Sequence, residues 1–182
     1  EITRDENGKA HAGQLVRAGR LAKYADEEHG EWKFLMWDED SKAPKMPMGS
    51  SGFRWATEKG KWNLKMEDGQ DDTPLDPELT FLDEHDEIVN VAYHEFADAK
   101  VALRGIPIRY VETDRGRVPV TTAFDLLVAQ FGVSRGLPGD YPKSYDEIGP
   151  YTPAWQEQYT GIGRDTVTRL AREFAHNAEV TN

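Results

Sequence analysis

The 182-residue sequence contains no cysteine. This absence excludes disulfides, thiolate nucleophiles, zinc ribbons and cysteine-ligated iron–sulfur clusters within the chain. Long hydrophobic runs are also absent, because no stretch approaches the roughly 20 apolar residues that a membrane-spanning helix requires. No signal peptide opens the chain. The sequence therefore predicts no direct membrane insertion.

Basic residues are scarce relative to acidic ones. Lys and Arg number 22 against 33 Asp and Glu, which gives a formal net charge of −11. Because nucleic-acid phosphates are held by basic surfaces, this balance argues against a nucleic-acid partner. It argues equally against docking on an anionic membrane surface. An acidic surface favours solubility, and adaptation to high salt is the alternative interpretation.

Hydrophobic residues make up only 38% of the chain, and the mean hydropathy is −0.72. Aromatic residues still reach 10%, including five Trp, which argues against disorder and for a globular core with long polar connections. The chain starts at Glu1 without Met and stops at Asn182 just beyond a strong helical pattern. We therefore expect residues 1–182 to be a single piece of something longer.

Residues 1–120 carry mostly strand and loop patterns, and residues 121–182 carry mostly helical ones. This order predicts an α+β fold, with an antiparallel, loop-rich β portion followed by a helical C-terminal third. Pro107 demotes its run to an edge strand or a strand start, and the segment Leu15–Ala18 fits a strand or a helix entry equally. Asp114–Arg117 is predicted to be a hairpin loop. The predicted strands are Trp32–Trp37, Lys61–Glu67, Ile88–Val91, Ile106–Glu112 and Val118–Val120.

The first helical pattern opens with Thr122 and Asp125, whose spacing resembles a capping box. Gly132 is a natural end for this helix. A long loop rich in Gly and Pro then covers residues 134–150, and such loops usually serve a site or an interface. The expected apolar face of the helix, at spacings of three and four, consists of Phe124, Leu127, Val128 and Phe131.

Two further helices are predicted near the C-terminus. Thr152 and Pro153 suit the N-cap and first position of a short helix that Gly161 ends. Asp165 lies in the first turn of the last helix, where the helix dipole favours a carboxylate. An apolar stripe along this helix predicts a packing face, either within this chain or on a missing remainder. It consists of Val167, Leu170, Ala171, Phe174, Ala175 and Ala178.

Metal-binding patterns are weak. The five histidines, His11, His29, His85, His94 and His176, include no pair at helical i, i+4 spacing. The acidic run Asp83–Glu87 could ligate a cation, although a solvated loop is the commoner use of such a run. Three aspartates around Gly69 resemble a calcium loop without its positional pattern; they are Asp68, Asp71 and Asp72.

Other candidate sites are equally unspecific. Ser50–Gly52 lacks the context of a nucleophile elbow. Gly161–Gly163 could hold an anion at a helix N-terminus, but simple punctuation between helices is the plainer interpretation. The tryptophans could line a sugar platform, although packing is their default role; they are Trp32, Trp37, Trp55, Trp62 and Trp155. The residues alone identify no catalytic residue and no metal ligand.

A family resemblance is carried by longer segments. Tyr151–Ile162 followed by Thr166–Ala175 resembles a stretch of large molybdopterin oxidoreductases, in which a TP-x-W…TG helix leads into an LAREFA-type helix. Other segments are similar to the alpha subunit of respiratory, membrane-bound nitrate reductase, and with them the resemblance spans nearly the whole chain in order, apart from residues 76–105. These segments are Gly13–Ala18, Glu31–Lys33, Gly49–Trp55, Lys59–Leu64, Val120–Leu127 and Phe131–Leu137.

The resemblance implies a parent subunit that reduces nitrate to nitrite in anaerobic respiration or nitrate assimilation. Its molybdenum would be held by two molybdopterin guanine dinucleotides and an Asp. A 4Fe-4S cluster bound by one His and Cys residues would receive electrons from an iron–sulfur beta subunit, and ultimately from quinol. None of these ligand motifs matches positions in this chain. We therefore expect an inactive scaffold fragment without a cofactor of its own, and the residues that contact the dinucleotides stay unknown.

The expected partners are the remainder of the alpha subunit, the beta subunit and, indirectly, a quinol-oxidising membrane subunit. The expected location is peripheral on the cell membrane, at the cytoplasmic face, with the opposite face as the alternative. Two other functions stay open: a non-catalytic, Trp-rich β binding module, and a segment of a related perchlorate, selenate or chlorate reductase. We also expect exposed apolar surface at Trp32–Trp37 and on the last helix to drive limited self-association.

Overall fold

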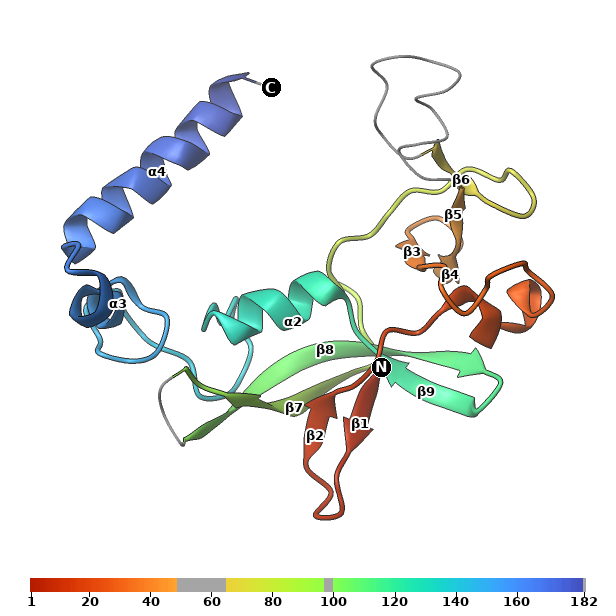
Figure 1. Cartoon of the computed structure of the whole chain (residues 1–182), viewed down its shortest axis with the longest axis horizontal. Helices are drawn as coiled ribbons and strands as arrows, with labels where there is room; N and C mark the ends of the chain where they lie inside the picture. The colour runs from red at the N-terminus through yellow and green to blue at the C-terminus, as the bar shows by residue number, and fades with distance from the viewer. Residues whose placement is uncertain (49–64, 97–99, 182) are drawn as a thin grey trace. The chain divides into compact units, whose positions relative to one another are not determined.

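A computed structural model describes residues 1–48, 65–96 and 100–181 (Figure 1). The chain divides into two compact units. Unit 1 comprises Glu1–Ile88 and Pro107–Asp125, and unit 2 comprises Val89–Ile106 and Leu126–Asn182. Antiparallel strands dominate the first two thirds of the described chain, and three α-helices follow. The predicted α+β fold is therefore confirmed.

The main sheet has five strands in the order β1-β2-β7-β8-β9. The segment between β2 and β7 forms two small antiparallel sheets. β3 (Met36–Asp38) pairs with β4 (Ala43–Lys45), and β5 (Pro47–Met48) pairs with β6 (Lys65–Asp68). The strands of the main sheet are β1 (Ile2–Arg4), β2 (Ala10–Ala12), β7 (Glu87–His94), β8 (Val101–Thr113) and β9 (Gly116–Val120).

A small hydrophobic core lies within unit 1. It is built around two short 3-10 helices, η1 (Ala18–Arg20) and η2 (Ala22–Tyr24). Leu35, Trp37 and Val120 pack against it as partly buried residues. This core fixes the N-terminal loops against the C-terminal half of β8, and its buried members are Ala18, Leu21, Tyr24, Met46 and Val111.

Several strand predictions need correction. The run Trp32–Trp37 is mostly not a strand, because only its last two residues enter β3 and Trp32 is 75% exposed. Of the two alternatives for Leu15–Ala18, the strand is wrong and the helix entry is confirmed, because Ala18 begins the 3-10 helix η1. Of Lys61–Glu67, the part from Lys65 lies in β6, and residues 61–64 lie outside the described residues.

The prediction that Pro107 marks an edge strand or a strand start is wrong, since it lies inside β8, between β7 and β9 in the sheet. The β8–β9 ladder begins at the pair Arg109↔Val120. No ladder bond to β9 therefore requires the N–H that proline lacks. The carbonyl of Pro107 accepts a hydrogen bond from Thr121 Oγ1 at 2.8 Å, which ties the end of β9 to this part of β8.

The predicted hairpin loop is confirmed. Thr113 pairs with Gly116, so that Asp114 and Arg115 form a two-residue turn between β8 and β9. Gly116 has φ +88°, a backbone conformation that residues with a Cβ adopt only with steric strain.

The helix α2 (Ala123–Gln130) begins where the capping box predicts. The backbone N–H of Asp125 donates to Thr122 Oγ1 at 2.9 Å, and Gly132 follows the helix with φ +75°. The predicted apolar face is not the buried one, however, because Leu127 and Phe131 are about half exposed while Asp125 and Ala129 are fully buried. The helix turns its Asp125 side inward because that carboxylate accepts hydrogen bonds from the backbone N–H of Phe81 and from Thr80 Oγ1.

The last two helices also begin and end near the predicted positions. α3 (Pro153–Thr160) has Thr152 as its N-cap, and Thr152 Oγ1 accepts from the N–H of Trp155 at 3.0 Å. Gly161 ends it at φ +69°. α4 (Arg164–Thr181) follows and contains no buried residue. No described residue of the chain therefore buries the apolar stripe of α4, and Phe174 is 79% exposed.

This exposure leads to a first prediction. Replacing Phe174 by Ala in this chain should change the free energy of unfolding by no more than about 0.5 kcal/mol, as expected for a surface substitution. Arg172→Ala, on the opposite side of α4, is the matched control. Chemical denaturation of the three proteins measures the effect. A loss of about 3–5 kcal/mol for Phe174→Ala alone would mean that the stripe packs within this chain.

Candidate functional site

Unit 1 contains an apolar cavity of about 500 Å³. Its walls come from the N-terminal loops, from the segment before β7, and from the end of β9 with the start of α2. Three apolar side chains on it, Leu15, Phe34 and Leu79, are 53%, 58% and 63% exposed. The remaining lining residues are Glu1, Val16, Leu35, Met36, Trp37, Pro44, Pro77, Glu78, Phe81, Val111, Val120, Thr121, Thr122, Ala123 and Phe124.

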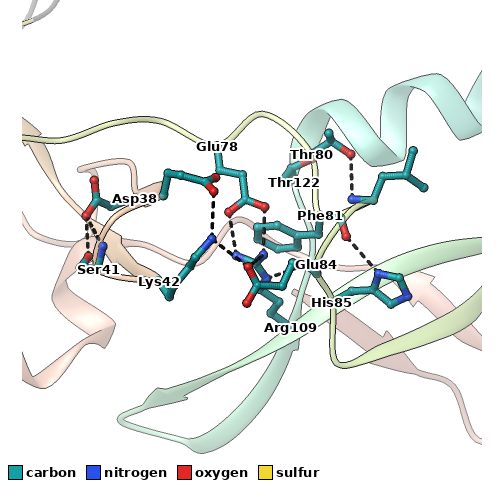
Figure 2. Close-up of polar contacts among 12 residues, drawn as sticks. Asp38, Ser41, Lys42, Glu78, Thr80, Phe81, Glu84, His85, Arg109 and Thr122 are labelled. Atoms are coloured by element: carbon teal, nitrogen blue, oxygen red, sulfur yellow. Dashed lines mark hydrogen bonds and ion pairs between the residues drawn. The ribbon is translucent and has the colours of Figure 1, made fainter.

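Arg109, in β8, stands behind the aromatic wall of this cavity. Its guanidinium lies 4.7 Å from the ring centre of Trp37 and 4.5 Å from that of Phe81. The same group forms a forked ion pair with Glu78, with Nη–Oε distances of 2.8 and 2.9 Å. Nε donates to the carbonyl of Glu84 at 2.9 Å (Figure 2). One cation thus orients two rings and neutralises the carboxylate of Glu78.

The acidic run Asp83–Glu87 is not gathered around a common point. The hydrogen bond from Lys42 lowers the pKa of Glu84, and Asp86 accepts from the backbone N–H of Tyr110. His85 Nδ1 lies 3.2 Å from the carbonyl of Phe81 (Figure 2). Across the described ranges, no three His, Asp or Glu side chains come together in a way that could hold a metal ion.

The aspartates around Gly69 hold an ammonium group of the chain itself. Lys23 Nζ lies 2.9 Å from Asp68 Oδ2 and 2.8 Å from Asp71 Oδ2. Tyr24 donates its hydroxyl proton to the fully buried Asp68. Burial, together with this hydrogen bond, raises the pKa of Tyr24 to about 12. The arrangement is an internal ion pair that fixes η2 to the turn after β6, rather than a calcium loop.

Asp38, at the end of β3, is a second buried carboxylate. Burial would raise its pKa, but Lys45, at 2.8 Å, and hydrogen bonds from Ser41 and from the N–H of Asp76 outweigh it and hold the pKa well below its usual range. The ionised carboxylate therefore links β3, β4 and the segment before β7.

The lowered pKa predicts acid sensitivity. A group with a folded-state pKa below its unfolded value stabilises the fold above the unfolded pKa and loses that contribution as the pH falls through the folded pKa. The stability advantage of the wild type over Asp38→Asn should thus be full at neutral pH and shrink below pH 3.8, the ordinary pKa of the group. Urea unfolding between neutral and acid pH measures it, with the exposed Asp40→Asn as control. A constant gap between wild type and Asp38→Asn would contradict the assignment.

Unit 2 has its own buried cation. Arg104, in β8, is 1% exposed, and its Nη2 lies 2.8 Å from Glu95 Oε1. Nη1 donates to the carbonyls of Ala129 and Gln130 at 3.0 and 3.1 Å, and Nε donates to the carbonyl of Asp140 at 2.9 Å. The guanidinium therefore satisfies the last carbonyls of α2 and fastens the following loop.

The Gly161–Gly163 segment opens α4, and a side chain of the chain fills the anion position. The carboxylate of Glu157 accepts a hydrogen bond from the backbone N–H of Arg164. It also forms an ion pair with the guanidinium of Arg164, with an Nη2–Oε2 distance of 3.0 Å. Hydrogen bonds from Arg164 lower the pKa of Glu157. The segment thus only separates α3 from α4, and the carboxylate of Glu157 interacts with the positive end of the α4 dipole.

The described tryptophans have separate surroundings. Trp37 lies in unit 1 under Arg109, and Trp32 is exposed in the same unit. Trp155, in unit 2, belongs to a cluster of rings with Phe96, Tyr151 and Tyr159 at centroid distances of 4.7–5.9 Å. The other two tryptophans, Trp55 and Trp62, lie outside the described residues, as do Ser50–Gly52 and the segments Gly49–Trp55 and Lys59–Leu64.

Comparison with known proteins gives a consistent result. No family model matches the chain. The nitrate reductase alpha chain of Bacillus subtilis is 39% identical over 175 residues, which is 95% of this chain. The respiratory nitrate reductase 1 alpha chain of Escherichia coli is 36% identical over 98% of the chain, and the nitrate reductase alpha subunit of Mycobacterium tuberculosis is 35% identical over 91%.

The chain spans only 14–15% of the length of these relatives. The chain belongs to the nitrate reductase alpha chain family. Among the described residues of the chain, none of the helices has the length and hydrophobicity of a membrane-spanning segment.

Proposed function

We propose that this chain is a scaffold segment of the molybdenum-containing catalytic subunit of a respiratory nitrate reductase. The parent reduces nitrate to nitrite with electrons from quinol. The observation that carries the proposal is the identity of 35–39% to nitrate reductase alpha chains over 91–98% of this chain. The buried guanidinium groups of Arg104 and Arg109 suit a scaffold, because each joins segments distant in sequence. Arg104 donates to the carbonyls of Ala129 and Asp140, and Arg109 pairs with Glu78.

The chain itself does not fit the cofactors of such a subunit. A 4Fe-4S cluster requires thiolate ligands, and the sequence has no cysteine. Several of the described carboxylates that could face a metal are engaged by cations of the chain; Asp68 and Asp71 bind Lys23, and Glu78 binds Arg109. The ligands of the 4Fe-4S cluster and of the molybdenum therefore belong to the remainder of the subunit, and no step of the reduction is assigned to residues 1–182.

The proposed assembly extends to other subunits. An iron–sulfur beta subunit would pass electrons to the catalytic subunit. The beta subunit would receive them from a quinol-oxidising membrane subunit. The catalytic subunit would sit peripherally on the membrane, at its cytoplasmic face. The designation "alpha chain" in the names of the relatives supports the existence of further subunits.

The sugar-binding alternative has less support. A carbohydrate platform needs exposed aromatic faces in one place, whereas Trp37 is covered by the guanidinium of Arg109 and Trp155 is packed among other rings. A segment of a perchlorate, selenate or chlorate reductase would have the same scaffold role. Only the oxyanion that the parent subunit reduces distinguishes this alternative from the proposal.

The test compares the parent with the isolated chain. The complete subunit should contain molybdenum and form nitrite from nitrate with reduced viologen, at higher turnover than with chlorate, selenate or perchlorate. The isolated 182-residue chain should contain no stoichiometric molybdenum or iron and form no nitrite. Preference of the parent for another oxyanion would overturn the substrate. Stoichiometric molybdenum in the isolated chain would overturn the scaffold role.

A further inference from the structure

The cavity of unit 1 is suited to an apolar occupant. The two carboxylates on its wall are neutralised within the chain, since Glu78 is paired with Arg109 at 2.8 Å and Glu1 with Arg20 at 2.5 Å. The hydroxyls of Thr121 and Thr122 are likewise engaged, with the carbonyl of Pro107 and with Asp125. A polar small molecule would find little to orient it, whereas apolar side chains would lose water on both sides of the contact.

The rim of the cavity is not covered by the described residues of this chain. Leu15, Phe34 and Leu79 are each more than half exposed, and all three border the same hollow. Behind them the indole N–H of Trp37 is buried without a hydrogen-bond partner among the described residues. Contiguous apolar surface of this kind marks an interaction site, and an unpaired buried donor costs stability until an acceptor reaches it.

We propose that this cavity receives an apolar segment of the same catalytic subunit from outside residues 1–182. The inference rests on the proposed function, because it requires the chain to be part of a larger subunit. The chain accounts for only 14–15% of the length of its relatives, so most of such a polypeptide lies beyond it. A segment of the same polypeptide acts at an effective concentration of roughly millimolar, which favours it over a separate subunit or a second copy.

Photocrosslinking in the complete, assembled enzyme tests the occupant. A benzophenone amino acid replaces Phe34 in one variant and Leu79 in a second, so that a folding failure of one leaves the other informative. The control position is Glu28, whose side chain is 87% exposed and does not line the cavity. After irradiation, mass spectrometry identifies the cross-linked peptides.

The expected products join positions 34 and 79 to catalytic-subunit peptides outside residues 1–182, in a yield well above that at position 28. Cross-links to another subunit, to a second copy or only within residues 1–182 would overturn the proposal, as would yields equal to the control. Nitrite formation and molybdenum content are measured on the unlabelled enzyme. An enzyme that reduces nitrate but gives the wrong cross-links would refute the occupant alone, and an enzyme that lacks molybdenum and nitrate reduction would refute the proposed function.

Discussion

Replacing Arg104 by Met is expected to lower the free energy of unfolding of unit 2 by about 3–5 kcal/mol, the usual cost of removing one partner from a buried ion pair. The substitution leaves Glu95, whose side chain is only 5% exposed, without its cation. It also removes the donors that satisfy the carbonyls of Ala129, Gln130 and Asp140. Methionine fills a similar volume, so the loss measures the missing hydrogen bonds and charge rather than a cavity.

Chemical denaturation measures this loss through fluorescence in a background that keeps Trp155, which lies in the same unit, as its only tryptophan. Arg104→Lys should recover only part of it, because an ammonium cannot reach an acid and three carbonyls with the fixed fork of a guanidinium. Arg115→Met, in the exposed β8–β9 turn, is the matched control and should stay within about 0.5 kcal/mol of wild type. If Arg104→Met and Arg115→Met were equally stable, the guanidinium would not be fastening α2.

Replacing Arg109 by Met should have a comparable effect in unit 1, again about 3–5 kcal/mol. Glu78 would lose a forked partner while its side chain is only 11% exposed. The carbonyl of Glu84 would lose its donor, and the rings of Trp37 and Phe81 would lose the cation beside them. The wall of the apolar cavity should loosen together with the fold.

Two measurements separate these effects. Denaturation gives the loss of stability. In a background that keeps Trp37 as its only tryptophan, a red shift of its emission before global unfolding would report the loosened wall. Glu84→Gln is the control, because Glu84 contacts Lys42 and Arg109 from a side chain that is 61% exposed, and its loss should be far smaller. An Arg109→Met protein with wild-type stability and emission would show that Glu78 and the rings hold their positions without the guanidinium.

Local signals in the sequence predicted local structure well. Thr122, Thr152 and Gly161 begin or end helices as their side chains or backbone freedom dictate. Each of these features depends on contacts within a few residues, which a sequence pattern contains in full. The hairpin between β8 and β9 was predictable for the same reason.

The apolar patterns were less informative, because periodicity identifies an apolar face without naming what covers it. Leu170 and Phe174 of α4, Leu127 of α2 and Phe131 just after it follow helical spacing, yet the described chain leaves each of them more than half exposed. Around α2 the buried carboxylate of Asp125 decides the orientation, through hydrogen bonds from Thr80 and Phe81 more than forty positions earlier. Such a distant partner leaves no mark in the spacing.

The sequence by itself determined the family, the α+β order and the ends of the helices, since these follow from segment matches and short-range rules. Only the tertiary structure decided the roles of Arg104 and Arg109. Both stand in an apolar strand run, and an arginine there signals a buried partner without identifying it. The partners, Glu95 for one and Glu78 for the other, are selected when strand pairing and loop closure bring them within hydrogen-bonding distance. Burial then makes each pairing obligatory, because an unpaired charge is costly away from water.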